Sequence, residues 1–289
     1  MKKAISIVMI FLLISSAFSQ NNGLKVFISV DMEGISGVVN WEEVSRTGKD
    51  YELFRRIMTE ETNAAIEGAI AGGATEVVVR DSHGSARNIL PDKLDKRAVL
   101  IRDWSGYPEA MMDGIDDSFD AVIFVGYHAM AGTPDATLDH TNSSSNINES
   151  SINGIDLPDA GWNALIAGYH DVPVCFVTGD QAICDQVKEL FGKVETVATK
   201  RGYGNAAICL HPDVAHDRIR KGIEKSLKEL NKYKPYKLQA PYKLELRLFQ
   251  EKLALDAAQF PGVKRKDAWT VQYTGDDLME VIKVFRWLY

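Results

Sequence analysis

Residues 24–34 read LKVFISVDMEG, an apolar run of strand length that ends in two acidic residues and a glycine. Side chains two positions apart on an extended segment share a face, so Asp31 and Glu33 are expected to project together. Neighbouring carboxylates repel each other unless a cation or a proton lies between them. The stretch therefore predicts a buried strand with a charged site at its carboxyl end. A turn or a helix cap is the alternative that this pair alone leaves open.

Similar apolar runs recur along the chain and alternate with helical patterns. The predicted strands are 24–30, 76–79, 98–101, 121–125, 172–178 and 194–199, and the predicted helices are 51–71, 159–169, 181–191 and 212–230. Apolar strands without polar alternation, separated by helices, indicate parallel pairing with both faces of the sheet covered. The sequence therefore predicts an α/β fold, a mostly parallel sheet flanked by helices.

A polar, proline-containing connector at 231–242 marks a change in organisation. Beyond it, strands are predicted at 244–249 and 269–273, and helices at 251–259 and 276–288. We interpret residues 24–232 as an α/β domain and residues 240–289 as a smaller C-terminal α+β subdomain, or as extra strands of the main sheet. The segment 141–151 (TNSSSNINESS) is too polar to pack, so we expect an exposed loop there.

Residues 1–19 are typical of a cleaved secretory signal peptide. Lys2 and Lys3 precede the apolar run 4–14, and small residues follow it. The run is too short for a typical membrane span, so we expect an exported protein, periplasmic or secreted, with no span after the leader is removed. An uncleaved anchor is the alternative interpretation.

Charge and cysteine content exclude several classes of site. Two of the 33 basic side chains lie in the leader, which leaves 31 against 40 acidic ones and a formal charge of −9. Such an acidic chain without a basic stripe is not expected to bind nucleic acid. Cys175, Cys184 and Cys209 predict neither a disulfide framework nor a thiolate metal site. Oxygen and imidazole would have to be the ligands of any metal.

Two further predicted strands end close to a histidine. One is followed by Asp81-Ser82-His83 and the other by Gly126-Tyr127-His128. Ligands of open α/β sheets bind beyond the carboxyl ends of the strands, so these histidines should meet the first acidic pair. Either histidine alone would more simply be structural, but two carboxylates and two imidazoles together suit Zn²⁺. Asp31, the first residue beyond its strand, is the predicted bridge between two ions.

Several ordered motifs resemble the zinc D-aminopeptidases of bacterial dipeptide-transport operons. They are residues 29–34, 58–61, 81–83, 126–129, 133–134, 161–164, 167–169 and 171–174. The resemblance extends from about residue 25 to residue 212, and more thinly to the C-terminus. It implies zinc-dependent hydrolysis of short peptides with an N-terminal D-amino acid such as D-alanine, and a ring-shaped homo-oligomer, a decamer. Operon members of the family are cytoplasmic, whereas this chain carries an export signal.

The resemblance also implies roles for individual residues. Asp31, Glu33, His83 and His128 match four ligands of a two-zinc site, and His140 matches the proposed catalytic histidine. The fifth ligand of the family is a glutamate, and its position here is Asp159. Aspartate is one methylene shorter, so the second zinc requires a closer backbone or an intervening water. Without the resemblance, His140 would be interpreted as a solvated loop histidine.

Two other functions remain open at this point. A different metal-dependent amide or ester hydrolase would use the same ligands. A periplasmic peptide-binding protein would share the compartment and the α/β fold but would need no metal. We expect segment 141–151 to line the substrate entrance, with Asp139 and Glu149 as weak candidates for contact with a substrate amine. The remaining histidines, His170, His211 and His216, are expected on the surface.

Overall fold

The main sheet has seven strands in the order β3 (Ala98–Ile101), β2 (Ala74–Asp81), β1 (Leu24–Val30), β4 (Ala121–Tyr127), β7 (Val174–Asp180), β8 (Glu195–Tyr203) and β9 (Ala206–Cys209). The computed structural model describes residues 23–288, so the predicted signal peptide lies outside the described residues. Every neighbouring pair in this sheet is parallel except β8 and β9, which are antiparallel. The run from Val26 to Val30 is fully buried at the centre of the sheet, as its apolar composition predicts.

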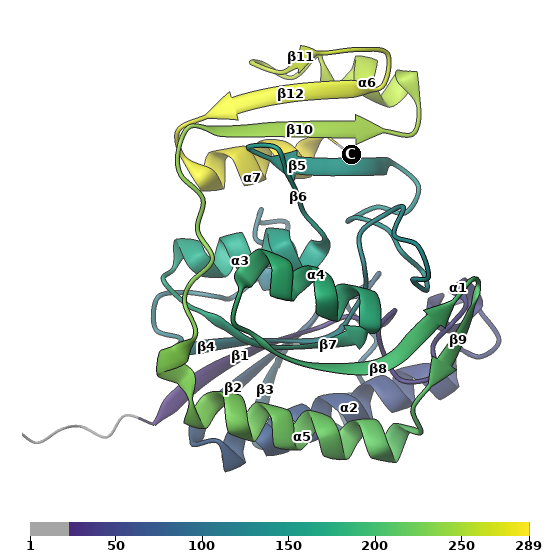
Figure 1. Ribbon diagram of the computed structural model, residues 1–289, viewed down its shortest axis with the longest axis vertical. Coiled ribbons are helices and arrows are strands. Elements are labelled where there is room, and N and C mark those ends of the chain that lie inside the picture. The colour runs from purple at the N-terminus through teal and green to yellow at the C-terminus, as the bar shows by residue number, and fades with distance from the viewer. Residues whose placement is uncertain (1–22, 289) are drawn as a thin grey trace, which may run out of the picture.

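Helices cover both faces of this sheet (Figure 1). The helices α2 (Tyr51–Ala71) and α5 (Pro212–Lys228) pack against each other and against one face. The helices α3 (Asp159–Tyr169) and α4 (Gln181–Phe191) cover the other face, and the short helix α1 (Trp41–Val44) follows β1. The predicted α/β class, a mostly parallel sheet flanked by helices, is confirmed.

A second, antiparallel sheet lies beyond α3 and α4 (Figure 1). Its order is β11 (Lys264–Arg265), β12 (Thr270–Gly275), β10 (Tyr242–Leu248), β5 (Ile147–Ile152) and β6 (Ile155–Asp156), and α6 (Glu251–Ala257) and α7 (Leu278–Trp287) accompany it. Two of its strands therefore come from the middle of the chain. The division into 24–232 and 240–289 remains a prediction, but this sheet is built from both ranges.

The expectation of an exposed loop at 141–151 is only partly correct, because residues 141–146 have no regular secondary structure but the rest of the segment belongs to a strand. Thr141 is buried, and β5 begins at Ile147 and pairs with β10. Ile147, Ser150 and Ile152 face the interior, and Ser150 accepts a hydrogen bond from the indole of Trp162 at 2.9 Å. The serine and asparagine content did not indicate a strand with one buried face, because the inward serine is satisfied by a side chain on α3 rather than by solvent.

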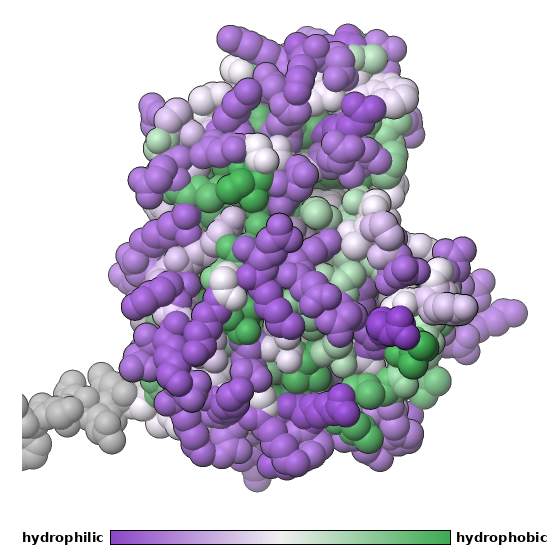
Figure 2. Space-filling view, viewed as in Figure 1, coloured by the Kyte–Doolittle hydropathy of each residue, from purple (hydrophilic) through white to green (hydrophobic). Residues whose placement is uncertain are grey.

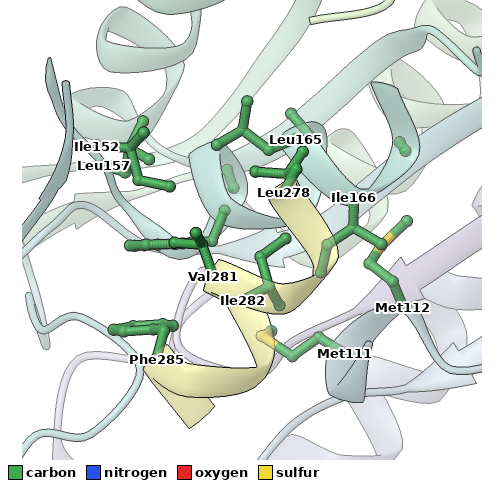
Figure 3. Packing of buried hydrophobic residues seen from close by; sticks show 14 of the residues in the cluster. Met111, Met112, Ile152, Leu157, Leu165, Ile166, Leu278, Val281, Ile282 and Phe285 are labelled. Carbon is green, nitrogen blue, oxygen red and sulfur yellow. The ribbon is translucent and has the colours of Figure 1, made fainter. Parts of the chain in front are cut away.

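One hydrophobic cluster joins the two sheets (Figure 3). It includes α3, α7 and the short 3-10 helix η1 (Ala110–Met112). The rings of Trp162 and Phe285 stack with centroids 4.0 Å apart and planes 6° apart. A second short 3-10 helix, η2 (Leu230–Lys232), follows α5 at the start of the connector to β10.

The face seen in Figure 2 is mostly hydrophilic, and its apolar side chains gather in small patches. Within residues 23–288, no helix combines the length and the apolar character that crossing a bilayer requires.

Candidate metal centre

The carboxyl ends of β1, β2 and β4 meet at one edge of the main sheet. Val30 is paired with Asp81 on one side and with Val125 on the other. The chain after β1 is then held against β4, because the Asp31 amide donates to the Val125 carbonyl at 2.8 Å. Gly34 follows close behind, and a Cβ there would lie 2.0 Å from the Tyr127 carbonyl oxygen. Glycine is therefore required for this close approach.

Asp31, Glu33 and His83 form a first group of possible metal ligands. The Nδ1 atom of His83 lies 3.2 Å from Asp31 Oδ1 and 3.0 Å from Glu33 Oε2. The other ring nitrogen, Nε2, lies 2.9 Å from the carbonyl oxygen of Val44. A carbonyl only accepts hydrogen bonds, so Nε2 carries the proton. In the neutral ring, Nδ1 then presents its lone pair to the two carboxylates.

Asp31, His128 and Asp159 form a second group. His128 Nε2 lies 3.5 Å from Asp31 Oδ2 and 3.8 Å from Asp159 Oδ2. The Nδ1–H of the same ring donates to the Ala129 carbonyl at 3.0 Å, which leaves Nε2 unprotonated in the neutral ring. Asp31 thus directs one carboxylate oxygen to each histidine and belongs to both groups.

His140 lies beside the second group but belongs to neither. Its ring stacks on that of His128, with centroids 3.8 Å apart and planes 12° apart. Its Nδ1 donates to the Leu138 carbonyl at 2.9 Å, so Nε2 is the nitrogen available to a substrate. Burial and the neighbouring His128 lower the pKa of His140 below its usual value. His140 is therefore held as a neutral imidazole.

A cavity of about 290 Å³ opens onto these groups. Its walls include His140, the aromatic side chains of Trp41 and Trp104, and residues 142–144. The start of segment 141–151, which has no regular secondary structure, thus borders the cavity. Asp139 and Glu149 are not among the residues that line it.

The comparisons with known proteins agree with this geometry. A family model described as D-aminopeptidase matches residues 24–287. The chain belongs to the D-aminopeptidase family. It is 36% identical to a D-aminopeptidase of Bacillus subtilis (strain 168) over 261 residues, which cover 89% of this chain and 93% of the relative.

A solved structure adds the same relationship in three dimensions. The zinc-dependent D-aminopeptidase DppA from Bacillus subtilis, described as a self-compartmentalizing protease, superposes with a TM-score of 0.88 at 34% identity. The match covers 92% of this chain and 96% of DppA. The resemblance inferred from the sequence motifs is thus confirmed, and it includes both sheets.

In this member of the D-aminopeptidase family, the pKa shifts within the two ligand groups show whether these groups fit a cation. Burial, together with the charge of Glu33, raises the pKa of Asp31 to about 7. Burial lowers the pKa of His128, but the Asp159 and Asp31 carboxylates outweigh burial and raise it to about 9. Without a cation, the negative charge of the buried carboxylates thus favours protonation of Asp31 and His128.

A single buried atom makes the fit specific. Nε2 of His128 has no hydrogen-bond partner among the residues that the structure describes. An unsatisfied buried imidazole nitrogen is costly, and here it faces two carboxylate oxygens at distances too long for good hydrogen bonds. A cation between these three atoms would satisfy all of them, so the residues fit a metal ion.

Several residues around the site carry no sequence signal that would have identified them. Trp41 and Trp104 line the cavity from segments for which no element was predicted. Lys200 is buried and donates a hydrogen bond to the backbone of the 33–38 segment. The sequence did not indicate it, because a lysine near the end of a predicted strand is normally solvated.

Proposed function

We propose that this chain is a zinc-dependent aminopeptidase that hydrolyses short peptides whose N-terminal residue is a D-amino acid such as D-alanine. Membership of the D-aminopeptidase family supports the class of reaction. The observation that carries the proposal is the position of Asp31, whose two oxygens face separate histidines. In addition, Nε2 of His128 has no hydrogen-bond partner within residues 23–288.

We assign Asp31, Glu33 and His83 to one zinc ion and Asp31, His128 and Asp159 to a second, with Asp31 as the bridge. Asp159 reaches the second group although aspartate is shorter than glutamate, because it lies at the first turn of α3. Its Oδ1 accepts a hydrogen bond from the backbone amide of Asn142 at 2.7 Å, so its Oδ2 is turned toward His128. Zn²⁺ in such a site polarises a carbonyl and lowers the pKa of bound water from 15.7 to about 7.

His140 accepts and returns protons in this proposal. Its Nδ1–H is fixed on the Leu138 carbonyl, which orients Nε2 toward the reacting groups. Its lowered pKa keeps the ring neutral near pH 7, as a general base requires. Trp41 packs edge-on against the ring, with centroids 5.3 Å apart, and lines the same cavity.

Zinc content and turnover on matched D- and L-aminoacyl peptides test the proposal together. We expect purified protein to hold zinc and to cleave D-alanyl peptides in preference to their L-counterparts. Cleavage of phosphate esters instead of peptides would identify another metal-dependent hydrolase. Protein that binds peptides without metal and without turnover would be a binding protein, and the proposal would be wrong.

We further propose that the protein is exported and assembles into a closed homo-oligomer, a ring-shaped decamer. The signal-like residues 1–19 support export. The description of DppA as self-compartmentalizing supports the assembly. N-terminal sequencing of the protein from a periplasmic fraction should begin shortly after residue 19, and light scattering should give ten times the mass of one chain.

A further inference from the structure

Lys200 is buried within β8, with only 2% of its surface exposed. Its ammonium donates to three backbone carbonyls, those of Glu33, Ile35 and Val38. An ammonium has three hydrogens, so its whole donor capacity is used on one short segment. That segment, 33–38, begins with one of the proposed zinc ligands.

The neighbouring residue makes the same kind of contact. Thr199 donates through its hydroxyl to the Gly34 carbonyl at 2.7 Å, and Gly179 offers a second acceptor at 3.0 Å. From another side, the Ser36 amide donates to Glu61 Oε1 at 2.8 Å. The 33–38 segment has no regular secondary structure, so these side chains take the place of a strand partner.

A buried cation needs a reason beyond packing. Removing an ammonium from water is costly, and an apolar side chain of similar volume would fill the same space without that cost. The carboxylates of Asp180 and Glu61 act on its charge, and each keeps one oxygen without a hydrogen-bond partner among the described residues. The hydrogen bonds of Lys200 therefore go to the backbone beside the metal ligands rather than to these acids.

We infer that Thr199 and Lys200 form a clamp that fixes the backbone of Glu33 and thereby sets the metal affinity of the first ligand group. The clamp acts through Glu33 and touches no substrate, so both members are positioning residues. The inference rests on the proposed zinc site, but it does not depend on which peptide is cleaved.

Lys200→Met in the full-length mature protein tests the clamp, because methionine keeps most of the side-chain length and removes the hydrogen bonds. We expect zinc to bind one of its two sites about 10- to 100-fold more weakly in competition with a chelator. The visible spectrum of the cobalt-substituted protein should also change, because it reports the geometry of the ligands.

Ile223→Ala is the matched control. Ile223 is fully buried on α5, outside the proposed metal site, so its truncation should lower the melting temperature and leave zinc affinity and the cobalt spectrum unchanged. A folded Lys200→Met protein with the zinc affinity and cobalt spectrum of the wild type would overturn the inference.

Thr199→Val keeps the test decisive if Lys200→Met does not fold. Valine has almost the shape of threonine, so this variant should fold and bind one zinc more weakly than the wild type does. Unchanged affinity in Thr199→Val would then overturn the clamp. Wild-type protein that binds zinc but cleaves no D-aminoacyl peptide would contradict the proposed function and leave this measurement intact.

Discussion

Asp31 is shared by both ligand groups, whereas Asp159 belongs to one. Asp159→Asn should therefore lower the zinc content from two equivalents per chain toward one. Asp31→Asn should lower the zinc content of both ligand groups. Metal analysis after dialysis measures this directly. Asp156→Asn, an exposed position just before α3, is the control and should keep full zinc content. Equal loss in the two site variants would contradict separate groups.

His140 is placed to move protons without holding a metal. His140→Ala should keep its zinc and lose about 10²- to 10⁴-fold in turnover, the usual contribution of a positioned acid or base. Zinc content and kcat on a D-alanyl peptide are the measurements, with His211→Ala, an exposed histidine at the start of α5, as the control. Unchanged turnover would remove His140 from the mechanism.

Glu61 provides a pH-dependent test of the buried charges near the clamp. Burial raises its pKa from 4.5 to about 7. Because the folded chain binds this proton more tightly than the unfolded chain does, Glu61 stabilises the fold most at pH values below its pKa in the unfolded chain. That contribution is lost as the pH rises through about 7. Glu61→Gln should therefore gain on the order of 3 kcal/mol over the wild type near pH 8 and almost nothing near pH 4.5.

Denaturant unfolding of both proteins at the two pH values measures this difference. The Ser36 amide can still donate to the carbonyl oxygen of glutamine, so the main hydrogen bond of the site survives the substitution. A stability difference that does not change with pH would show that Glu61 titrates normally in the folded chain.

Among the elements, the parallel strands were the most predictable. Their apolar runs are continuous because both faces are buried, and parallel strands bring their carboxyl ends to one edge. This rule alone was enough to bring together Asp31, Glu33, His83 and His128. It could not include Asp159, which lies at the start of a helix and was assigned only by resemblance.

One strand and one buried residue show where the local sequence pattern was insufficient. The strand β5 is rich in serine and asparagine, and only its contacts with β10 and Trp162 make it a strand. In the same way, nothing beside Lys200 in the sequence indicates burial, because its partners are carbonyls more than 160 residues away. Such residues are determined by tertiary contacts that composition does not record.

At the scale of the whole molecule, the hydrophobic cluster between the sheets should make them unfold together. Phe285 is buried against Trp162 in this cluster, so Phe285→Ala should cost about 3–5 kcal/mol. Trp287→Ala on the same helix removes a side chain that is 71% exposed and should cost less than about 0.5 kcal/mol.

Urea unfolding followed by circular dichroism and by tryptophan fluorescence distinguishes the two variants. Both signals should report one shared transition, shifted to lower urea in Phe285→Ala. Separate transitions for the two signals would mean that the sheets are independent units.

The position of strand β5 limits how the two layers of this protein can be exchanged between genes. It lies beside β10 in the second sheet, yet about 90 residues separate the two in sequence, and α3, α4 and α5 lie between them. A gene fragment cut at any one point would carry an incomplete version of one layer. Neither layer is therefore encoded by one continuous segment, so exchanging either layer with another protein would require the replacement of two separate segments of the chain.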